Sequence, residues 1–356
     1  MTKFPEKQLL PWFEKNSRDL PWRRNRTPYA AWVSEIMLQQ TQVRQVEPYY
    51  RRFMEWFPEI RTLAKARIDK VLKAWEGMGY YSRARNLHQT AKMVVKQFDG
   101  KLPTTVEQLI QLPGIGRSTA GAILSLVYNQ PLPILDGNVK RVLIRVFNIR
   151  KEPRKPSTIR ELWDLAAALL PAQQPGLFNE ALMELGALIC RPKDPDCPHC
   201  PIKRKCLAYA QGNPPDLPLK VPGKKIPHYD VTAAVIRRGN KILITQRPEK
   251  GLLGGLWEFP GGKREKEESL AECLKREIKE ELDLEIQVEE APFLKVKHAY
   301  SHFRITLHCF FCRRPSGRIK LKGVKDFRWV FPFELVDFAF PRADQKVIAY
   351  LTAFKS

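Results

Sequence analysis

The sequence predicts two domains, an all-α domain followed by a smaller α+β domain, and three features indicate this division. Residues 1–210 carry apolar side chains at three- and four-residue spacing, which is typical of packed helices. Residues 211–228 (QGNPPDLPLKVPGKKIPH) contain five prolines and three lysines, a composition expected of an extended, semi-stiff linker. In residues 229–356 the apolar period shortens toward two, as in strands. A chain of 356 residues is long enough to bury two cores.

The helices of the first domain follow from this periodicity, with proline and glycine between them. They are predicted at Ala30–Val43, Val71–Trp75, Ala84–Phe98, Ser118–Tyr128, Val139–Phe147 and Glu161–Leu170.

The second domain is predicted to contain both strands and a helix. The runs Val231–Ile236, Lys241–Gln246 and Ile305–Cys312 are rich in β-branched and aromatic residues and predict strands. Arg237–Asn240 is the expected hairpin turn between the first two, and Ser269–Glu281 has the pattern of an amphipathic helix.

The charge of the chain favours a polyanionic partner. Lysine and arginine number 61 against 38 acidic residues, giving a net charge of +23, and such an excess is typical of nucleic-acid binding. The N-terminal MTKFPEKQLLPWFEK lacks the apolar core of a signal peptide, and no uninterrupted apolar run approaches 18 residues. We therefore expect an intracellular protein with no membrane partner.

The run Leu112–Gly116 (LPGIG) predicts a tight turn that opens directly into a helix. Backbone N–H groups at such a turn point outward and can hold a phosphate oxygen. Asp136 follows in an apolar setting, before the helix that starts near Val139, so it is also a candidate helix N-cap. A phosphate cradle followed by one acid suggests an enzyme that holds DNA and acts on a sugar.

Four of the seven cysteines lie close together and predict a metal centre rather than disulfides. Their spacing is C-x6-C-x2-C-x5-C, and four thiolates suit either an iron–sulfur cluster or zinc. Zinc favours two short C-x-x-C pairs, whereas only one pair is short here. The candidate ligands are Cys190, Cys197, Cys200 and Cys206.

Taken together, LPGIG, the LDGNV run around Asp136 and the cysteines resemble the helix–hairpin–helix base-excision glycosylases of the endonuclease III superfamily. The motif SEIMLQQTQV at Ser34–Val43 narrows the resemblance to the MutY adenine DNA glycosylases. The resemblance implies a helix–hairpin–helix domain with a structural, DNA-positioning [4Fe–4S] cluster on the four cysteines. It implies removal of adenine mispaired with 8-oxoguanine or guanine in double-stranded DNA.

The resemblance assigns the chemistry to two carboxyl groups. Glu35 has apolar neighbours on its helix, and desolvation of a carboxyl raises its pKa and keeps a proton available. Its counterpart in the family protonates N7 of adenine, whereas Asp136 stabilises the oxocarbenium-like sugar or bonds to it transiently. Asn138 corresponds to the residue that orients this carboxylate and the water.

Ser118 distinguishes two enzyme classes. Relatives with lyase activity carry a lysine here that attacks the sugar, and serine cannot form a Schiff base. We therefore expect a monofunctional glycosylase that leaves an abasic site. A bifunctional lyase and a non-catalytic lesion-binding protein are the alternatives.

The remaining contacts with DNA are implied by the resemblance alone. They comprise an adenine pocket of Trp22, Arg23 and Glu180, insertion into the duplex by Gln40 and Tyr80, and backbone phosphate contacts at Leu112, Gly114, Gly116 and Ser118.

The second domain carries a nearly complete Nudix box, in which only the late glycine is replaced, by Asp283. Its motif residues are Gly262, Glu268, Arg276, Glu277, Glu280 and Glu281. Three glutamates at i, i+3 and i+4 of one helix can share Mg²⁺, so hydrolysis of a nucleoside diphosphate linkage is an open alternative activity.

The family's C-terminal domain is Nudix-like and recognises 8-oxoguanine through a Phe-Ser-His loop. The match here is Tyr300-Ser301-His302, in which tyrosine keeps the aromatic ring. The resemblance further implies a monomer acting on DNA in a bacterial nucleoid.

Overall fold

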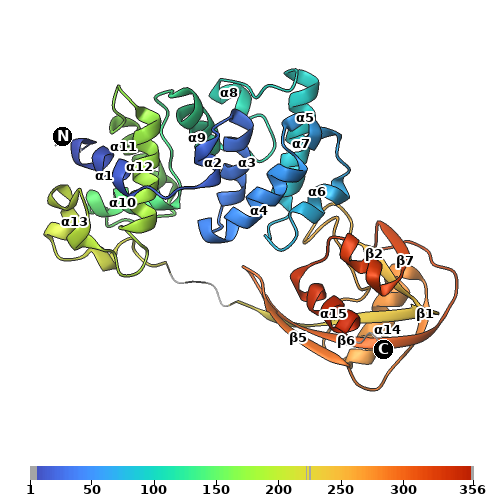
Figure 1. Cartoon of the computed structure of the whole chain (residues 1–356). Helices are drawn as coiled ribbons and strands as arrows, with labels where there is room; N and C mark the ends of the chain where they lie inside the picture. The colour runs from blue at the N-terminus through green and yellow to red at the C-terminus, as the bar shows by residue number, and fades with distance from the viewer. Residues whose placement is uncertain (1–5, 222, 224–225, 354–356) are drawn as a thin grey trace. The chain divides into compact units, whose positions relative to one another are not determined.

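The computed structural model describes residues 6–221, 223 and 226–353 and divides into two compact units. The first unit comprises Met1–Lys65 and Asn86–Gly223, and the second comprises Ala66–Arg85 and Lys224–Ser356. The first unit is helical, whereas the second is built on a sheet (Figure 1). The all-α and α+β classes predicted for the two halves are therefore confirmed.

The helices of the first unit run from α1 to α13, with α6 missing because it belongs to the second unit. Helix α7 begins in the second unit and continues into the first. The bounds are α1 (Glu6–Asn16), α2 (Pro21–Arg24), α3 (Pro28–Leu38), α4 (Val43–Trp56), α5 (Ile60–Lys65), α7 (Ser82–Gln97), α8 (Val106–Leu109), α9 (Arg117–Tyr128), α10 (Gly137–Val146), α11 (Pro156–Ala168), α12 (Pro175–Leu188) and α13 (Leu207–Ala210), with 3₁₀ turns η1 (Cys197–His199), η2 (Lys203–Lys205) and η3 (Pro214–Asp216).

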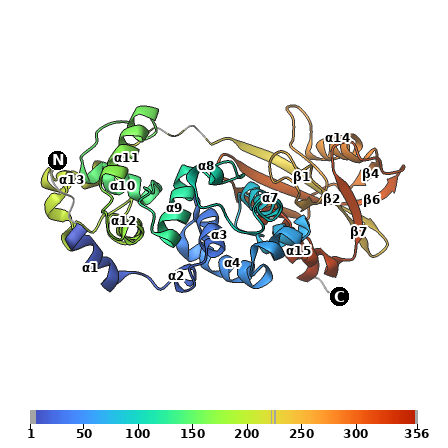
Figure 2. The ribbon, with the colours of Figure 1, turned by 90° about the horizontal axis from the view of Figure 1, so that it is seen from above.

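One core of the first unit lies where α10 and α12 pack against each other (Figure 2). Val139 and Leu143 of α10 are fully buried there together with Phe178 and Leu185 of α12. Burial of such side chains stabilises the fold by about 1.5–3 kcal/mol each. This packing fixes the N-terminus of α10, where Asp136 lies.

The helix predicted over Ala30–Val43 is wrong at its C-terminal end. Helix α3 stops at Leu38 and α4 starts at Val43, with a turn between them. Gln40 adopts a left-handed backbone (φ 59°), which no α-helix can accommodate. The regular spacing of apolar residues continues across the break, because Val43 and Val46 belong to α4 rather than to α3.

The second unit contains α6, the sheet and the helices that cover it. The bounds are α6 (Ile68–Ala74), β1 (His228–Arg238), β2 (Lys241–Gln246), β3 (Trp257–Glu258), α14 (Leu270–Leu282), β4 (Glu285–Val288), β5 (Leu294–Ala299), β6 (Arg304–Ser316), β7 (Asp326–Val330), η4 (Pro332–Asp337) and α15 (Arg342–Ala353).

The strand order is β3-β2-β1-β6-β4, with β5 paired to β6 and β7 paired to β2. Strands β1 and β6 are parallel, from His228 beside Arg304 to Ile236 beside Cys312, and the other pairs are antiparallel. Alternating residues of β1 face opposite sides of the sheet, as the period of two requires. Ala234 packs with α14 on one side, and Ala233 packs with α15 on the other (Figure 2).

The predicted linker 211–228 is only partly a linker. Leu217 is 2% exposed in the core of the first unit, and its carbonyl accepts a hydrogen bond of 2.9 Å from Arg145 Nε. Strand β1 already begins at His228. Residues 222, 224 and 225 of the predicted linker lie outside the described residues. Among the described helices, none has the length and apolar character needed to cross a membrane.

The grouping of Ala66–Arg85 with the second domain is not anticipated by the sequence boundaries. Asp69 accepts a hydrogen bond of 3.1 Å from Gln246, and Arg85 donates one of 2.6 Å to the carbonyl of Gly254. These polar contacts join segments that lie more than a hundred residues apart in the chain.

Candidate active site

Asp136 caps the N-terminus of α10, as predicted. Its Oδ1 accepts a hydrogen bond of 2.7 Å from the amide of Val139, and its Oδ2 accepts one of 3.0 Å from Asn138 Nδ2. Burial raises the pKa of this carboxyl above its ordinary value, and the two hydrogen bonds oppose that rise. The helix N-terminus also favours the ionised form. The carboxylate is therefore held in one orientation by two donors.

Glu35 lies on α3 beside buried side chains and is itself half-buried. Its neighbours Trp32 and Ile36 are 0% and 2% exposed, and α3 starts with Pro28 after a Thr27 cap whose Oγ1 accepts from the Ala30 amide at 3.1 Å. Burial raises the pKa of Glu35 to about 8, and the nearby carboxylates of Asp136 and Glu180 add to the rise. At neutral pH this carboxyl therefore carries a proton that it can donate.

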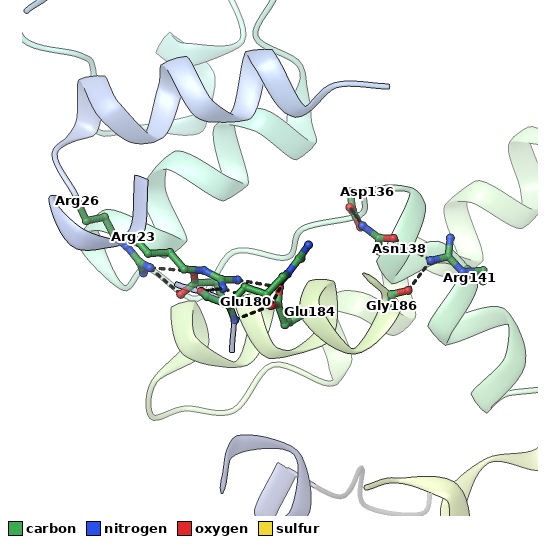
Figure 3. Close-up of polar contacts among 9 residues, drawn as sticks. Arg23, Arg26, Asp136, Asn138, Arg141, Glu180, Glu184 and Gly186 are labelled. Carbon is green, nitrogen blue, oxygen red and sulfur yellow. Dashed lines mark hydrogen bonds and ion pairs between the residues drawn. The ribbon is translucent and has the colours of Figure 1, made fainter. Parts of the chain in front are cut away.

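Two buried glutamates of α12 bind a group of arginines, as Figure 3 shows. Glu180 accepts from Arg23 Nε at 2.8 Å and from Arg26 Nη2 at 2.8 Å. Glu184 accepts from Arg23 Nη2 at 3.0 Å and from Arg18. Burial pushes the pKa of Glu184 up, but the hydrogen bonds from Arg18 and Arg23 bring it down to about 2. The structure thus brings together the predicted pocket residues Arg23 and Glu180.

A chain of hydrogen bonds leads from Asp136 to the cysteine loop through Asn138 and Arg141 (Figure 3). Arg141 Nη2 donates to Asn138 Oδ1 at 2.8 Å and to the carbonyl of Gly186 at 2.7 Å, and its Nε donates to the carbonyl of Cys190 at 2.7 Å. Gly186 is required because a Cβ there would lie 2.6 Å from Asn138 Cβ. Arg141 therefore holds Asn138, which in turn orients Asp136.

Ser118 ties the start of α9 to the segment that precedes Asp136. Its Oγ accepts a hydrogen bond of 3.3 Å from the amide of Leu135. In the preceding turn, Gly114 has a left-handed backbone (φ 82°) and Gly116 is the N-cap of α9. The amide of Leu112 donates to the carbonyl of Leu109 at 3.1 Å, so it is engaged inside the turn.

The predicted duplex-contact residues differ in exposure. Trp22 is 8% exposed and packs edge-on against Tyr50, with ring centroids 5.3 Å apart. Gln40 is exposed. Tyr80, in the second unit, is 39% exposed and adopts a left-handed backbone (φ 48°). A non-glycine residue in that region costs about 1–3 kcal/mol, so the surrounding structure must hold it there.

The four cysteines line one apolar cavity beside α10, together with Val142, Leu185 and Ile202. Arg145 is 1% exposed at its edge and donates to Cys190 Sγ at 3.3 Å and to the carbonyl of Arg191 at 2.7 Å. Thiols around one cavity, with a buried cation to balance thiolate charge, fit a soft metal centre. Within the described part of the chain, no three Cys, His, Asp or Glu side chains are set at metal-binding distance as they stand.

Tyr300-Ser301-His302 forms the turn between β5 and β6 in the second unit. The Tyr300 ring stacks on Phe303, with centroids 4.7 Å apart, and packs on the core, whereas Ser301 and His302 are exposed. Ser301 Oγ lies 2.6 Å from the hydroxyl oxygen of Tyr80. The structure therefore brings a predicted insertion residue and the predicted lesion-reading loop together within one unit.

One arginine binds three Nudix-box carboxylates, of which one precedes α14 and two lie on it. Arg276 donates to Glu268 at 2.8 Å and to both Glu277 and Glu280 at 3.1 Å. Among the described residues the buried Glu281 Oε2 has no hydrogen-bond partner, and burial, with Glu258 and Glu277 nearby, raises the pKa of Glu281 to about 8.

Asp283, which replaces the last glycine of the Nudix box, caps the C-terminus of α14 with a left-handed backbone (φ 58°). Glycine is the usual residue in that conformation. Here the Asp283 carboxylate accepts from Lys320 at 2.9 Å and from Lys322 at 3.2 Å instead. The replacement therefore ties the end of α14 to the segment that follows β6.

Both halves of the chain match known protein families. Residues 33–168 match the family model of the HhH-GPD superfamily of base excision DNA repair proteins, and residues 231–350 match the NUDIX domain. The adenine DNA glycosylase of Buchnera aphidicola subsp. Schizaphis graminum is 40% identical over 301 residues, which cover 84% of each chain. The chain belongs to the adenine DNA glycosylase family.

Other adenine DNA glycosylases are similarly related. The human one is 37% identical over 360 residues, covering 85% of this chain and 65% of that protein. Among solved structures, a thermostable thymine-DNA glycosylase is 29% identical with a TM-score of 0.53, covering 58% of this chain and 94% of the other. A trapped endonuclease III–DNA intermediate, at 20% identity and TM-score 0.51 with the same coverage, shows the same fold.

Several residues that hold this candidate site together are not among those predicted from the sequence. Arg141 and Arg145 follow Asn138 on one face of α10, so their i+3 and i+7 spacing could have revealed them. Arg18, Arg26 and Glu184 gave no such signal, because their pairing depends on α12 meeting the start of the chain.

Proposed function

We propose that this protein removes adenine from A:8-oxoguanine and A:G mispairs in double-stranded DNA and leaves the abasic strand intact. The observation that carries the proposal is the pair of carboxyls with opposite tasks, Glu35 with its pKa raised to about 8 and Asp136 fixed at a helix N-terminus. Cleavage of a glycosidic bond commonly uses one carboxyl group that donates a proton and a second, ionised carboxylate that acts on the sugar.

In this mechanism Glu35 donates its proton to N7 of the flipped adenine, which makes the base a better leaving group. Asp136 then stabilises the positive charge that develops on the sugar. Asn138 holds the Asp136 carboxylate by the 3.0 Å hydrogen bond and is itself held by Arg141. Trp22, Arg23 and Glu180 are proposed to line the adenine pocket.

The proposed product follows from Ser118. A hydroxyl in the position of a nucleophilic amine cannot form a Schiff base with the sugar. The Ser118 Oγ accepts from Leu135, the residue before Asp136, and so supports the catalytic segment instead.

The proposed grip on DNA uses the amides of Gly114, Gly116 and Ser118 at the start of α9, where the helix dipole favours a phosphate. Leu112 serves this turn through packing, since it is 3% exposed and its amide is engaged. Gln40 and Tyr80 are proposed to enter the duplex beside the flipped base, and both have left-handed backbones at loop tips.

The proposed cofactor is a [4Fe–4S] cluster held by Cys190, Cys197, Cys200 and Cys206, with zinc as the alternative. When bound, such a cluster would stiffen the loop that carries the Cys190 carbonyl to which Arg141 donates. Brown, iron-containing purified protein is expected, and colourless protein loaded with zinc would contradict the assignment.

For the second domain we propose recognition of 8-oxoguanine through Ser301 and His302, which are exposed at the tip of the β5–β6 turn. The Tyr300 ring packs inside the domain, so it would support the turn rather than stack on the lesion. The domains proposed from the sequence, 1–210 and 229–356, would divide catalysis and lesion reading between them.

The test is a glycosylase assay on A:8-oxoguanine, A:G and A:T duplexes, each analysed with and without alkali. Adenine release from the first two, with strand cleavage only after alkali, is expected. Strand cleavage without alkali in step with base loss would establish a lyase instead, and binding without base release would establish a lesion-binding protein.

A further inference from the structure

The segment 69–85, which carries Tyr80, makes a series of polar contacts with the rest of the second unit. Side chains along it bond to strand, loop and helix-flanking residues of that unit; the contributors are Asp69, Lys73, Glu76, Tyr80 and Arg85. These contacts belong neither to the catalytic carboxyls nor to the cysteine loop.

Glu76 is bound from two directions. Its Oε1 accepts a hydrogen bond of 2.8 Å from the amide of Phe340, and its Oε2 accepts one of 2.6 Å from Lys73 Nζ. Lys73 Nζ also donates to the carbonyl of Phe338 at 2.9 Å. The Glu76 and Lys73 side chains are only 16% and 23% exposed. Charge-assisted hydrogen bonds that are largely shielded from water are the strong ones.

The segment Phe338–Phe340, which forms these bonds with Glu76 and Lys73, packs against the core of the second unit. Phe340 is 0% exposed and stacks on Phe259, with centroids 5.7 Å apart. The carbonyl of Ala339 accepts from the amide of Trp257 at 2.9 Å, and the Phe338 ring packs edge-on against Trp257. The Glu76 carboxylate is therefore hydrogen-bonded to a segment packed in the core of residues 226–353, the part of the second unit that we call the sheet domain.

Glu76 directly precedes a tight loop in which Tyr80 has an unfavourable backbone conformation. Gly77, Gly79 and Tyr80 have φ of 90°, 78° and 48°, all in the left-handed region. Trp75 Nε1 donates to the carbonyl of Gly79 at 3.0 Å, and the Arg83 guanidinium lies 5.2 Å from the centre of the Tyr80 ring. Tyr80 keeps this conformation only when the surrounding structure holds it there.

We propose that Glu76 is a positioning residue through which the Phe338–Phe340 segment of the sheet domain holds the Gly77–Tyr80 loop and presents Tyr80 to the duplex. The proposal rests on the insertion role of Tyr80 given under the proposed function. It assigns the sheet domain a second task, which is to set the geometry of the insertion loop whichever base lies opposite the adenine.

The first test measures hydrogen exchange of residues 77–82 in the free full-length protein. Glu76→Ala removes both accepted hydrogen bonds, and we expect faster exchange in this loop. Glu76→Gln keeps one acceptor, for the Phe340 amide, but loses the charge-assisted bond from Lys73, so its exchange rate should lie between those of wild type and Glu76→Ala. The control is Glu161→Ala, because Glu161 pairs with Lys151 at 2.9 Å on the exposed surface of the first unit and should leave the loop unchanged.

The second test is a double-mutant cycle on single-turnover adenine release from an A:8-oxoguanine duplex. We expect Glu76→Ala to slow release about tenfold through misplacement of Tyr80, and the Glu76→Ala/Tyr80→Ala protein to be no slower than Tyr80→Ala alone. The proposal would be overturned by any of three results. The first is that the rate losses of Glu76→Ala and Tyr80→Ala multiply in the double variant. The others are that Tyr80→Ala releases adenine as fast as wild type, or that hydrogen exchange of residues 77–82 is unchanged in Glu76→Ala. Wild-type protein that releases no adenine would contradict the proposed function, whereas the exchange measurement would still test the hold of Glu76 on the loop.

Discussion

In the proposed mechanism the pKa of Glu35 sets the alkaline limit of activity, and the expected limit follows from the surroundings of this carboxyl. Burial raises this pKa to about 8. A carboxyl with that pKa is about 90% protonated at pH 7, whereas an ordinary glutamate would be about 0.3% protonated. The environment of α3 therefore increases the population of the acid form about 300-fold, equivalent to about 3 kcal/mol.

Because the acid must be protonated to act, activity is present below the pKa of Glu35 and is lost above it. The assay is kcat/KM for adenine release from pH 4 to pH 10, since this ratio reports groups of the free enzyme. We expect a fall of about tenfold between pH 7 and pH 9, and of about tenfold for each further unit. On the acid side, Asp136 must be ionised, so activity is lost as the pH falls through its raised pKa.

DNA affinity measured over the same pH range is the control, because loss of binding would imitate loss of the acid. A profile that is flat from pH 7 to pH 10 while binding stays constant would refute the reasoning. So would a decline that begins near pH 4.5, the ordinary range of a glutamate.

Three further predictions concern stability and positioning. Arg141→Ala should slow adenine release by about tenfold to a hundredfold with little change in DNA affinity, because Asp136 loses its orienting chain; equal rates in a single-turnover assay would contradict this. Glu35→Gln should raise the free energy of unfolding at pH 7 by at most about 3 kcal/mol. The reason is that Glu35 of the wild type ionises in the unfolded state above pH 4.5, which favours unfolding, whereas glutamine does not ionise. Urea titrations should therefore show that this gain in stability vanishes at pH 4. Truncation after Lys220 should leave a folded helical unit that has lost its preference for 8-oxoguanine, and an unchanged preference in duplex competition would refute the reading role of the tail. Truncation before Leu217 should in addition lower the Tm of the helical unit, because Leu217 is buried in its core.

Much of the fold could be predicted from local patterns. The limits of β2 coincide with the predicted strand Lys241–Gln246, and α9 and α14 differ from their predictions by about a residue. These segments have clean periodicity and definite ends, such as the Ser269 capping box of α14. The break at Gln39–Gln42 could not be predicted, because the apolar period runs on while the backbone turns.

The candidate site was predictable where one residue and its neighbours in the chain decide its chemistry. The capping role of Asp136 follows from the helix that comes after it, and the raised pKa of Glu35 follows from its apolar flanks. The pairing of Arg23 with Glu180 rests on the family resemblance, because more than 150 positions separate them in the chain. The contact of Glu76 with Phe340 has no signal in the sequence, since a backbone amide is the donor.

The central claim is that the Glu35 carboxyl supplies the proton that releases adenine. The most direct measurement compares single-turnover adenine release from an A:8-oxoguanine duplex by wild type and by Glu35→Gln, which keeps the shape of the side chain but has no acidic proton. Glu35→Gln is expected to bind the duplex as tightly as wild type and to release no measurable adenine. Release at the wild-type rate by Glu35→Gln would contradict the claim.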